Sequence, residues 1–189
     1  MIYTSIDIET TGRNPELHQV IEFAAIVEDT EKQLSFEKIP KFHFVVRPYG
    51  DIIGEPIALC MNKRIFDMLG NPKSSSIPII RPDELSRTFA QWIKTKVISK
   101  TIDNRLIVAG KNFGTFDKLF LENLSGWKEN VPSFHQRIID PAIQYCDFTK
   151  DEMIPNTEEC MKRAGLIQEN AHNALYDAWN VIQLLRKKY

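Results

Sequence analysis

The sequence has few cysteines and no long apolar run. Its three cysteines, Cys60, Cys146 and Cys160, stand far apart among 189 residues, and no CxxC pair indicates a zinc or dithiol site. No stretch of 18 apolar residues occurs, and the chain reaches Asp7 and Glu9 without a basic and apolar leader. We therefore expect reduced thiols in a cytoplasmic protein, with neither an export signal nor a membrane span.

An excess of charge of one sign is also missing. The chain has 24 lysines and arginines against 25 aspartates and glutamates, so its total charge does not indicate a protein that coats duplex nucleic acid electrostatically. Any nucleic acid has to be held locally. The 43% hydrophobic and 26% charged residues are ordinary for a globular protein of one domain, which we expect to span residues 1–189.

The hydrophobic pattern predicts strands followed by alternating helices and strands. Residues 2–9 alternate between apolar and polar side chains, and residues 20–27 form an apolar run typical of a strand covered on both faces. The remaining predicted strands are 42–46, 105–109 and 137–140, and the predicted helices are 55–69, 83–96, 116–124, 155–164 and 173–188. Proline and serine between 70 and 82 indicate a surface loop. The order predicts a mixed α/β sheet flanked by helices.

Two acidic residues share one face of the first predicted strand. Asp7 and Glu9 are two positions apart, so their side chains project side by side at roughly 7 Å. At an effective dielectric of 20 their repulsion is about 2 kcal/mol, which a cation between them would relieve. Two solvated acids on an edge strand are the alternative interpretation.

Two further aspartates lie on the apolar stripes of predicted helices. Asp117 falls among Phe113, Phe120 and Leu121 at helical spacing, and Asp177 borders the apolar face of the last helix. A buried carboxylate has to be protonated, paired or bound to a metal. For Asp117, capping of its own helix is the alternative role.

A histidine lies five residues before the last of these acids. His172 precedes the helix that carries Asp177, and histidine exchanges protons near neutral pH, as a general base for water requires. A capping or surface histidine is the alternative. Ligands that are all carboxylates favour Mg²⁺ or Mn²⁺ over zinc.

Together these motifs resemble a known enzyme family. The segment Asp7-Ile8-Glu9-Thr10-Thr11-Gly12, then Asn112 to Leu121 around Asp117, then His172 and Asp177 spaced H-x4-D, are similar in order and separation to the DEDD 3′-to-5′ exonucleases, in the branch with histidine. The sister branch has tyrosine where this chain has Asn173. Two residues depart from the usual family pattern: Lys111 stands in place of a histidine before Asn112, and Asn173 in place of an arginine.

The resemblance implies a fold, a metal site and a reaction. The fold is an RNase H-like domain with a five-stranded mixed sheet whose first strand is central. The implied ligands of two Mg²⁺ or Mn²⁺ ions are Asp7, Glu9, Asp117 and Asp177, and His172 activates the attacking water. The implied contacts to the terminal nucleotide are Thr10, Thr11 and Gly12, and Asn112 is expected beside them. Phe113 and Phe116 are candidates to stack on a base, with a place in the core as the alternative.

The function predicted is hydrolysis of a single strand of DNA or RNA from its 3′ end, releasing nucleoside 5′-monophosphates. Two alternatives remain open. One is a non-catalytic nucleic-acid-binding domain that keeps the fold, and the other is an endonuclease of the same fold. The sequence does not distinguish DNA from RNA, because no device for reading the 2′-hydroxyl is evident.

Overall fold

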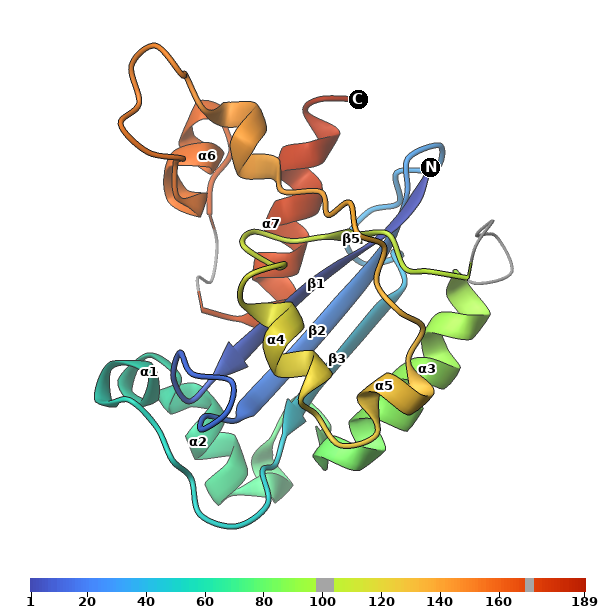
Figure 1. Ribbon diagram of the computed structural model, residues 1–189, viewed down its shortest axis with the longest axis vertical. Coiled ribbons are helices and arrows are strands. Elements are labelled where there is room, and N and C mark those ends of the chain that lie inside the picture. Colours follow the sequence, from blue (N-terminus) through green and yellow to red (C-terminus); the bar gives the residue numbers. More distant parts are fainter. Residues whose placement is uncertain (98–103, 169–171) are drawn as a thin grey trace.

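A mixed sheet of five strands forms the centre of the protein. The computed structural model describes residues 1–97, 104–168 and 172–189 (Figure 1). The strands are β1 (Ile2–Thr10), β2 (Val20–Asp29), β3 (Lys41–Val46), β4 (Ile79–Ile80) and β5 (Val108–Ala109). They are arranged in the order β4-β3-β2-β1-β5. The neighbours β1–β2 and β2–β3 are antiparallel, whereas β1–β5 and β3–β4 are parallel.

The sheet confirms the predicted class and corrects three details. The expectation of a central first strand was wrong, because β2 takes the centre and β1 lies beside it. The predicted strand 137–140 was also wrong, since only an isolated bridge joins Ile139 to Ala109. The fifth strand is instead β4, inside the segment expected to be a loop. Its two residues, Ile79 and Ile80, pair with the end of β3, and such a short pairing leaves no periodicity in the sequence.

Helices cover both faces of the sheet (Figure 1). They are α1 (Pro56–Met61), α2 (Lys63–Gly70), α3 (Pro82–Lys96), α4 (Asp117–Glu122), α5 (Trp127–Asn130), α6 (Thr157–Arg163) and α7 (Ala174–Arg186), with short 3-10 turns η1 (Pro72–Ser74) and η3 (Pro141–Tyr145). The single helix expected over 55–69 is two helices, broken at Asn62. The side-chain amide of Asn62 donates to the carbonyl of Thr10 at 3.2 Å, so a tertiary contact fixes the break.

The alternation of β1 and β2 sorts their side chains onto two faces. Aromatic residues of one face, including Phe23 and Phe42, pack edge to face with Phe89 of α3. The other face packs against α7, where the Ser5 hydroxyl donates to the Ala178 carbonyl at 2.8 Å. The odd-numbered residues of β1 share the face of Ser5, so Asp7 and Glu9 project toward α7.

No helix within residues 1–97, 104–168 and 172–189 combines the length and the apolar character that a bilayer crossing requires.

Candidate active site

The topology brings the acidic residues to one edge of the sheet. Strands β1 and β5 are parallel, so the end of β1 and the segment that follows β5 meet at the same edge. Asp7 and Glu9 lie at this end of β1, and Asp117 is the first residue of α4 after β5. Helix α7 starts at the same edge and supplies Asp177 in its first turn.

Three of the carboxylates are close enough to share a cation. Oxygen atoms of Asp7, Glu9 and Asp177 all lie within 4.8 Å of one another. All three offer hard oxygen ligands of the kind that Mg²⁺ and Mn²⁺ prefer. Among the described residues, no other group of three or more histidines, cysteines or acids meets this distance. The donor set therefore fits a hard divalent ion.

Asp117 lies beside this group and is held by the neighbouring strand. Its Oδ1 accepts the backbone N–H of Ile8 at 3.2 Å, and its side chain is buried. The N-cap of α4 is Phe116, which makes no side-chain capping bond. The carboxylate thus ties α4 to β1 between Asp7 and Glu9, and its burial agrees with its predicted place on an apolar stripe.

Asp177 is oriented by the backbone that precedes its helix. Its Oδ2 accepts the N–H groups of His172 and Asn173 at 3.1 and 3.3 Å. Asn173 caps α7 by accepting from the N–H groups of Leu175 and Tyr176. His172 has a φ of 63°, in the left-handed region that a non-glycine residue enters at a cost. The hydrogen bond to Asp177 helps to hold this conformation.

The clustered acids resist ionisation when no cation is present. Burial, then Asp117, Glu9 and Asp177, raise the pKa of Asp7 well above its usual range. Burial, then Glu22 and Asp177, raise the pKa of Glu9 to about 8. Burial raises the pKa of Asp117 to about 7 and also raises that of Asp177. Four carboxyl groups perturbed upward at one place are typical of a functional site.

The acids line an open cleft of about 780 Å³. Its wall also includes His172, Lys111, Asn112 and Phe116, so the cleft contains the predicted base together with every predicted ligand. A second cleft of about 380 Å³ adjoins it. Ile8, Glu9 and Phe116 line both clefts, and Thr10 and Gly12 line the second.

A model of an exonuclease family, described as RNase_T, matches residues 4–59, which include β1 and its acidic motif. No curated protein matches the chain significantly by sequence.

Solved structures resemble the whole chain at low identity. The nuclease domain of 3′hExo, a DEDDh family member bound to rAMP, has a TM-score of 0.69 at 18% identity, covering 98% of this chain and 90% of that one. E. coli exonuclease I with a dT13 oligonucleotide has a TM-score of 0.66 at 18% identity, covering 98% of this chain and 40% of that one. A zinc-bound form of the same exonuclease with single-stranded DNA has a TM-score of 0.64 at 19% identity, covering 98% and 39%.

The fold is that of the DEDDh exonucleases. This finding confirms the predicted RNase H-like domain and supports the expectation of a nuclease. The chain spans 40% of the length of exonuclease I, and the likeness at this identity concerns the fold.

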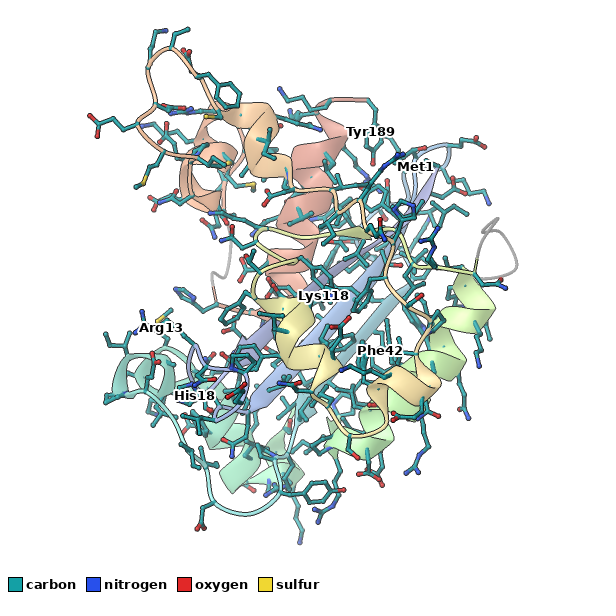
Figure 2. All side chains as sticks on the ribbon, viewed as in Figure 1. Met1, Arg13, His18, Phe42, Lys118 and Tyr189 are labelled. Atoms are coloured by element: carbon teal, nitrogen blue, oxygen red, sulfur yellow. The ribbon has the colours of Figure 1, made fainter. Side chains whose placement is uncertain are left out.

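Gly12, in the loop that follows β1, lies in close contact with a side chain of the same loop. A Cβ atom at Gly12 would lie 2.5 Å from the ring of His18, so any larger residue would require this ring to move. His18 in turn accepts the N–H of Asn14 at 2.9 Å and closes the loop. Figure 2 shows Arg13 and His18 on this loop, beside α1, and Arg13 is ion-paired with Glu55 at 3.0 Å.

Two of the residues predicted to contact a nucleotide are turned into the interior. Thr11 is fully buried, and its hydroxyl donates to the carbonyl of Ile53 at 2.6 Å. Phe113 is also fully buried and packs edge to face on Phe134 at 5.1 Å. The alternative role in the core therefore describes Phe113, whereas Phe116 lines both clefts of the exonuclease fold.

Other cleft residues were not selected from the sequence. Ile57 and Met61 of α1 line the second cleft and are exposed, although their spacing signals only a short helix. Lys111 lines the main cleft and was noted only as a departure from the family pattern. Asn156 and Thr157, at the start of α6, also line it. Polar residues at a helix start are common, so the sequence alone does not indicate that these two residues line the cleft.

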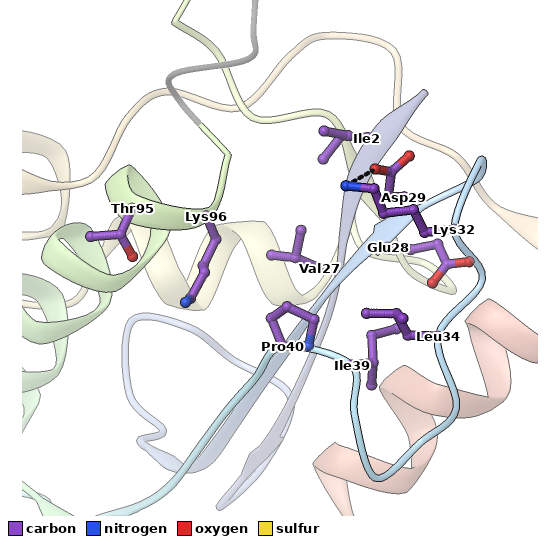
Figure 3. Close-up of a pocket in the computed structure, with 10 residues that line it drawn as sticks. All are labelled: Ile2, Val27, Glu28, Asp29, Lys32, Leu34, Ile39, Pro40, Thr95 and Lys96. Carbon is purple, nitrogen blue, oxygen red and sulfur yellow. Dashed lines mark ion pairs between the residues drawn. The ribbon is translucent and has the colours of Figure 1, made fainter.

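A small cavity of about 180 Å³ lies at the opposite end of the sheet, far along β1 and β2 from the acids (Figure 3). It is bounded by Ile2, Val27 and Leu34, with Asp29 paired to Lys32 at its edge. None of the predicted site residues contributes to this cavity.

Proposed function

We propose that the protein is a divalent-metal-dependent 3′-to-5′ exonuclease that releases nucleoside 5′-monophosphates from single-stranded DNA or RNA. The observation that carries the proposal is the approach of Asp7, Glu9 and Asp177 to within 4.8 Å, in the cleft that Asp117 and His172 also line. The DEDDh exonuclease fold supports the polarity and the end specificity.

The proposed ligands of two Mg²⁺ or Mn²⁺ ions are Asp7, Glu9, Asp117 and Asp177. Such ions, when bound, would polarise the scissile phosphate and lower the pKa of the attacking water. His172 would accept the proton of that water, as its exposed place at the rim of the cleft allows. Hydrogen bonds from the backbone N–H groups of residues 172 and 173 would orient the Asp177 carboxylate as a metal ligand.

The second cleft is the proposed site for the terminal nucleotide. Its exposed Ile57 and Met61 face the same space as Phe116, which suits the apolar faces of a base. Thr10 and Gly12 border this space next to Glu9. The shared wall at Glu9 would place the last phosphodiester of a bound strand at the acids.

End-labelled oligonucleotides test the function. The wild type should release mononucleotides from DNA or RNA with a free 3′ end when Mg²⁺ or Mn²⁺ is present, and circles should stay intact. We expect His172→Ala and Asp117→Ala to fold, by circular dichroism, and to lose at least about 100-fold in rate, since each removes a group that acts on the reacting atoms.

His135→Ala is the matched control, because His135 lies outside both clefts and should keep wild-type activity. Wild-type rates in His172→Ala or Asp117→Ala would overturn the assignment. Cleavage of a circle would indicate an endonuclease, and Mn²⁺-independent binding of strands without any release would indicate a binding domain.

A further inference from the structure

Two buried glutamates on β2 hold the two ends of α7. Glu22 and Glu28 are both fully buried, and they lie on the same face of the strand, six residues apart. A buried carboxylate is tolerated only when charged partners and hydrogen bonds compensate it. Glu22 and Glu28 have different partners, and they connect β2 to opposite ends of α7.

Glu28 anchors the end of α7, away from the candidate active site. Arg186 donates to it from Nε at 2.8 Å and from Nη2 at 2.7 Å, in a two-pronged ion pair. The hydroxyl of Tyr189 adds a third contact at 3.2 Å. These groups lie at the end of β2 that borders the small cavity.

Glu22 anchors the start of α7, directly behind the acids. Its Oε2 accepts the backbone N–H of Ala174, the first residue of α7, at 3.2 Å. Ala174 is less than one helical turn before Asp177. In the register of β1 and β2, Glu22 is also the cross-strand partner of Glu9. The Glu22 carboxylate thus contacts the helix that carries Asp177 and lies beside Glu9, and both of these acids are proposed metal ligands.

Two cationic or hydrogen-donating side chains hold Glu22 from its other side. His43 of β3 lies 2.8 Å from Oε1, and Arg64 of α2 lies 2.7 Å from Oε2. Although burial opposes ionisation, these two partners lower the pKa of Glu22 below its usual range. The remaining terminal nitrogen of Arg64, Nη1, is buried and has no hydrogen-bond partner among the described residues, so this guanidinium depends on Glu22.

We propose that Glu22 is a positioning residue for the candidate active site: by joining α2, β3 and the first residue of α7, it fixes Asp177 relative to Glu9. The inference rests on the proposed function for its kinetic consequences. Its structural part, the placement of the carboxylates that would bind Mn²⁺, is independent of turnover. Glu28 would stabilise the same helix equally, but it would have no effect on the positions of the carboxylates that would bind Mn²⁺.

The pair Glu22→Gln and Glu28→Gln tests this difference with one chemical change at two ends of one helix. Both variants should melt at a lower temperature than the wild type. For Glu22→Gln we expect kcat at saturating Mn²⁺ to fall about 10- to 100-fold, with KM for an oligonucleotide within about twofold, and Mn²⁺ affinity by calorimetry to weaken about tenfold. Glu28→Gln should stay within about twofold of the wild type in all three quantities.

The result that overturns the proposal is equal kcat and equal Mn²⁺ affinity in the two variants, at a temperature where both are folded. If Glu22→Gln does not fold, the partly exposed partner provides the test. Arg64→Gln should then show a smaller loss of kcat at unchanged KM, and wild-type kcat in that variant would equally overturn the proposal.

Different results would contradict the proposed exonuclease function. A wild type that binds Mn²⁺ but releases no nucleotide contradicts the exonuclease, while the Mn²⁺ affinities of the two variants still decide the role of Glu22. A wild type that binds no Mn²⁺ contradicts both.

Discussion

At the scale of single residues, the unusual feature of the cleft is its one lysine. Lys111 is half-buried in the wall of the cleft that also carries Asp7, Glu9, Asp117 and Asp177, and it forms no ion pair within 4.0 Å among the described residues. Burial lowers the pKa of its ammonium group, and the nearby Cys160 and Asp140 oppose that shift. Asp140 is engaged by the backbone, since it accepts the N–H of Asn112 at 3.1 Å. The ammonium group is therefore available for an anion that enters the cleft.

Lys111→Gln should weaken binding of the strand and spare the chemistry. Loss of one charge-assisted phosphate contact costs about 1.4 kcal/mol, so we expect KM for an oligonucleotide to rise about tenfold. The rise should shrink with added salt, because one phosphate contact contributes about 0.7 to the slope of affinity against salt for single strands. Steady-state kinetics between low and moderate salt measure both effects, with exposed Lys128→Gln as the control. An unchanged KM and salt slope would remove Lys111 from the binding surface.

At the scale of elements, the start of α7 is the part on which the candidate site depends most. Asn173 accepts two backbone N–H groups there, and its own N–H and that of His172 hold Asp177. Helix α6 has an equivalent cap, because Asn156 accepts the N–H of Glu159 at 2.8 Å. The two caps are chemically alike, but only one lies on the helix that bears a proposed ligand.

Asn173→Ala and Asn156→Ala should each lower the free energy of unfolding by about 1 kcal/mol, the usual value of an asparagine cap. Only Asn173→Ala should also weaken Mn²⁺ binding, because the frayed first turn would release Asp177. Denaturant unfolding and Mn²⁺ titration measure the two effects separately. Equal Mn²⁺ affinity in both variants would show that the site tolerates fraying of α7.

The elements that were predicted correctly are those long enough to show a period. The strands β1 and β2 and the helices α3 and α7 bury a continuous face, so their apolar spacing is visible in the sequence. The two-residue strand β4 has no period to detect and was missed, whereas β5 lies within the predicted strand 105–109 but is shorter than expected. The break between α1 and α2 depends on the contact of Asn62 with Thr10.

The residues of the candidate site likewise fall into those that the sequence indicated and those that it did not. The acids on helices stood out because a carboxylate on an apolar stripe has to be compensated, and Asp117 is indeed buried. Glu22 gave no such signal, since its role comes from a strand register and from partners on α2, β3 and α7. Thr11 was expected at a nucleotide from its motif position, and Phe113 was a stacking candidate with the core as its alternative. Neither motif position nor residue type shows the direction of a side chain.

At the scale of the whole molecule, the acidic cluster couples stability to pH. The pKa of Glu9 is raised from 4.5 to about 8 and that of Asp117 from 3.8 to about 7, so the folded state binds more protons than the unfolded state between these limits. A raised pKa of this kind contributes stability that is present at low pH and is lost as pH rises through the folded value. Asp151, whose pKa its hydrogen bonds with Arg163 lower, titrates below this window.

Without divalent metal, the melting temperature should therefore fall as pH rises from about 5 to 8. Saturating Mn²⁺ should raise the melting temperature most at the upper end, because it binds the ionised folded site. Asp7→Asn should flatten the metal-free profile, since it removes one of the mutually repelling charges. Thermal melts over this range, with a chelator and with Mn²⁺, give the profiles. A metal-free melting temperature that climbs from pH 5 to 8 would contradict the coupling.

The link between Glu22 and Ala174 spans 152 residues of sequence, and it has a consequence for synthesis. Strands β1 and β2 leave the ribosome early, whereas α7 emerges after all the other described elements. A nascent chain therefore carries Asp7 and Glu9 without Asp177 and exposes the sheet face that α7 later covers. The proposed nuclease would be inert until α7 docks, so hydrolysis of nucleic acid near the ribosome would await that step.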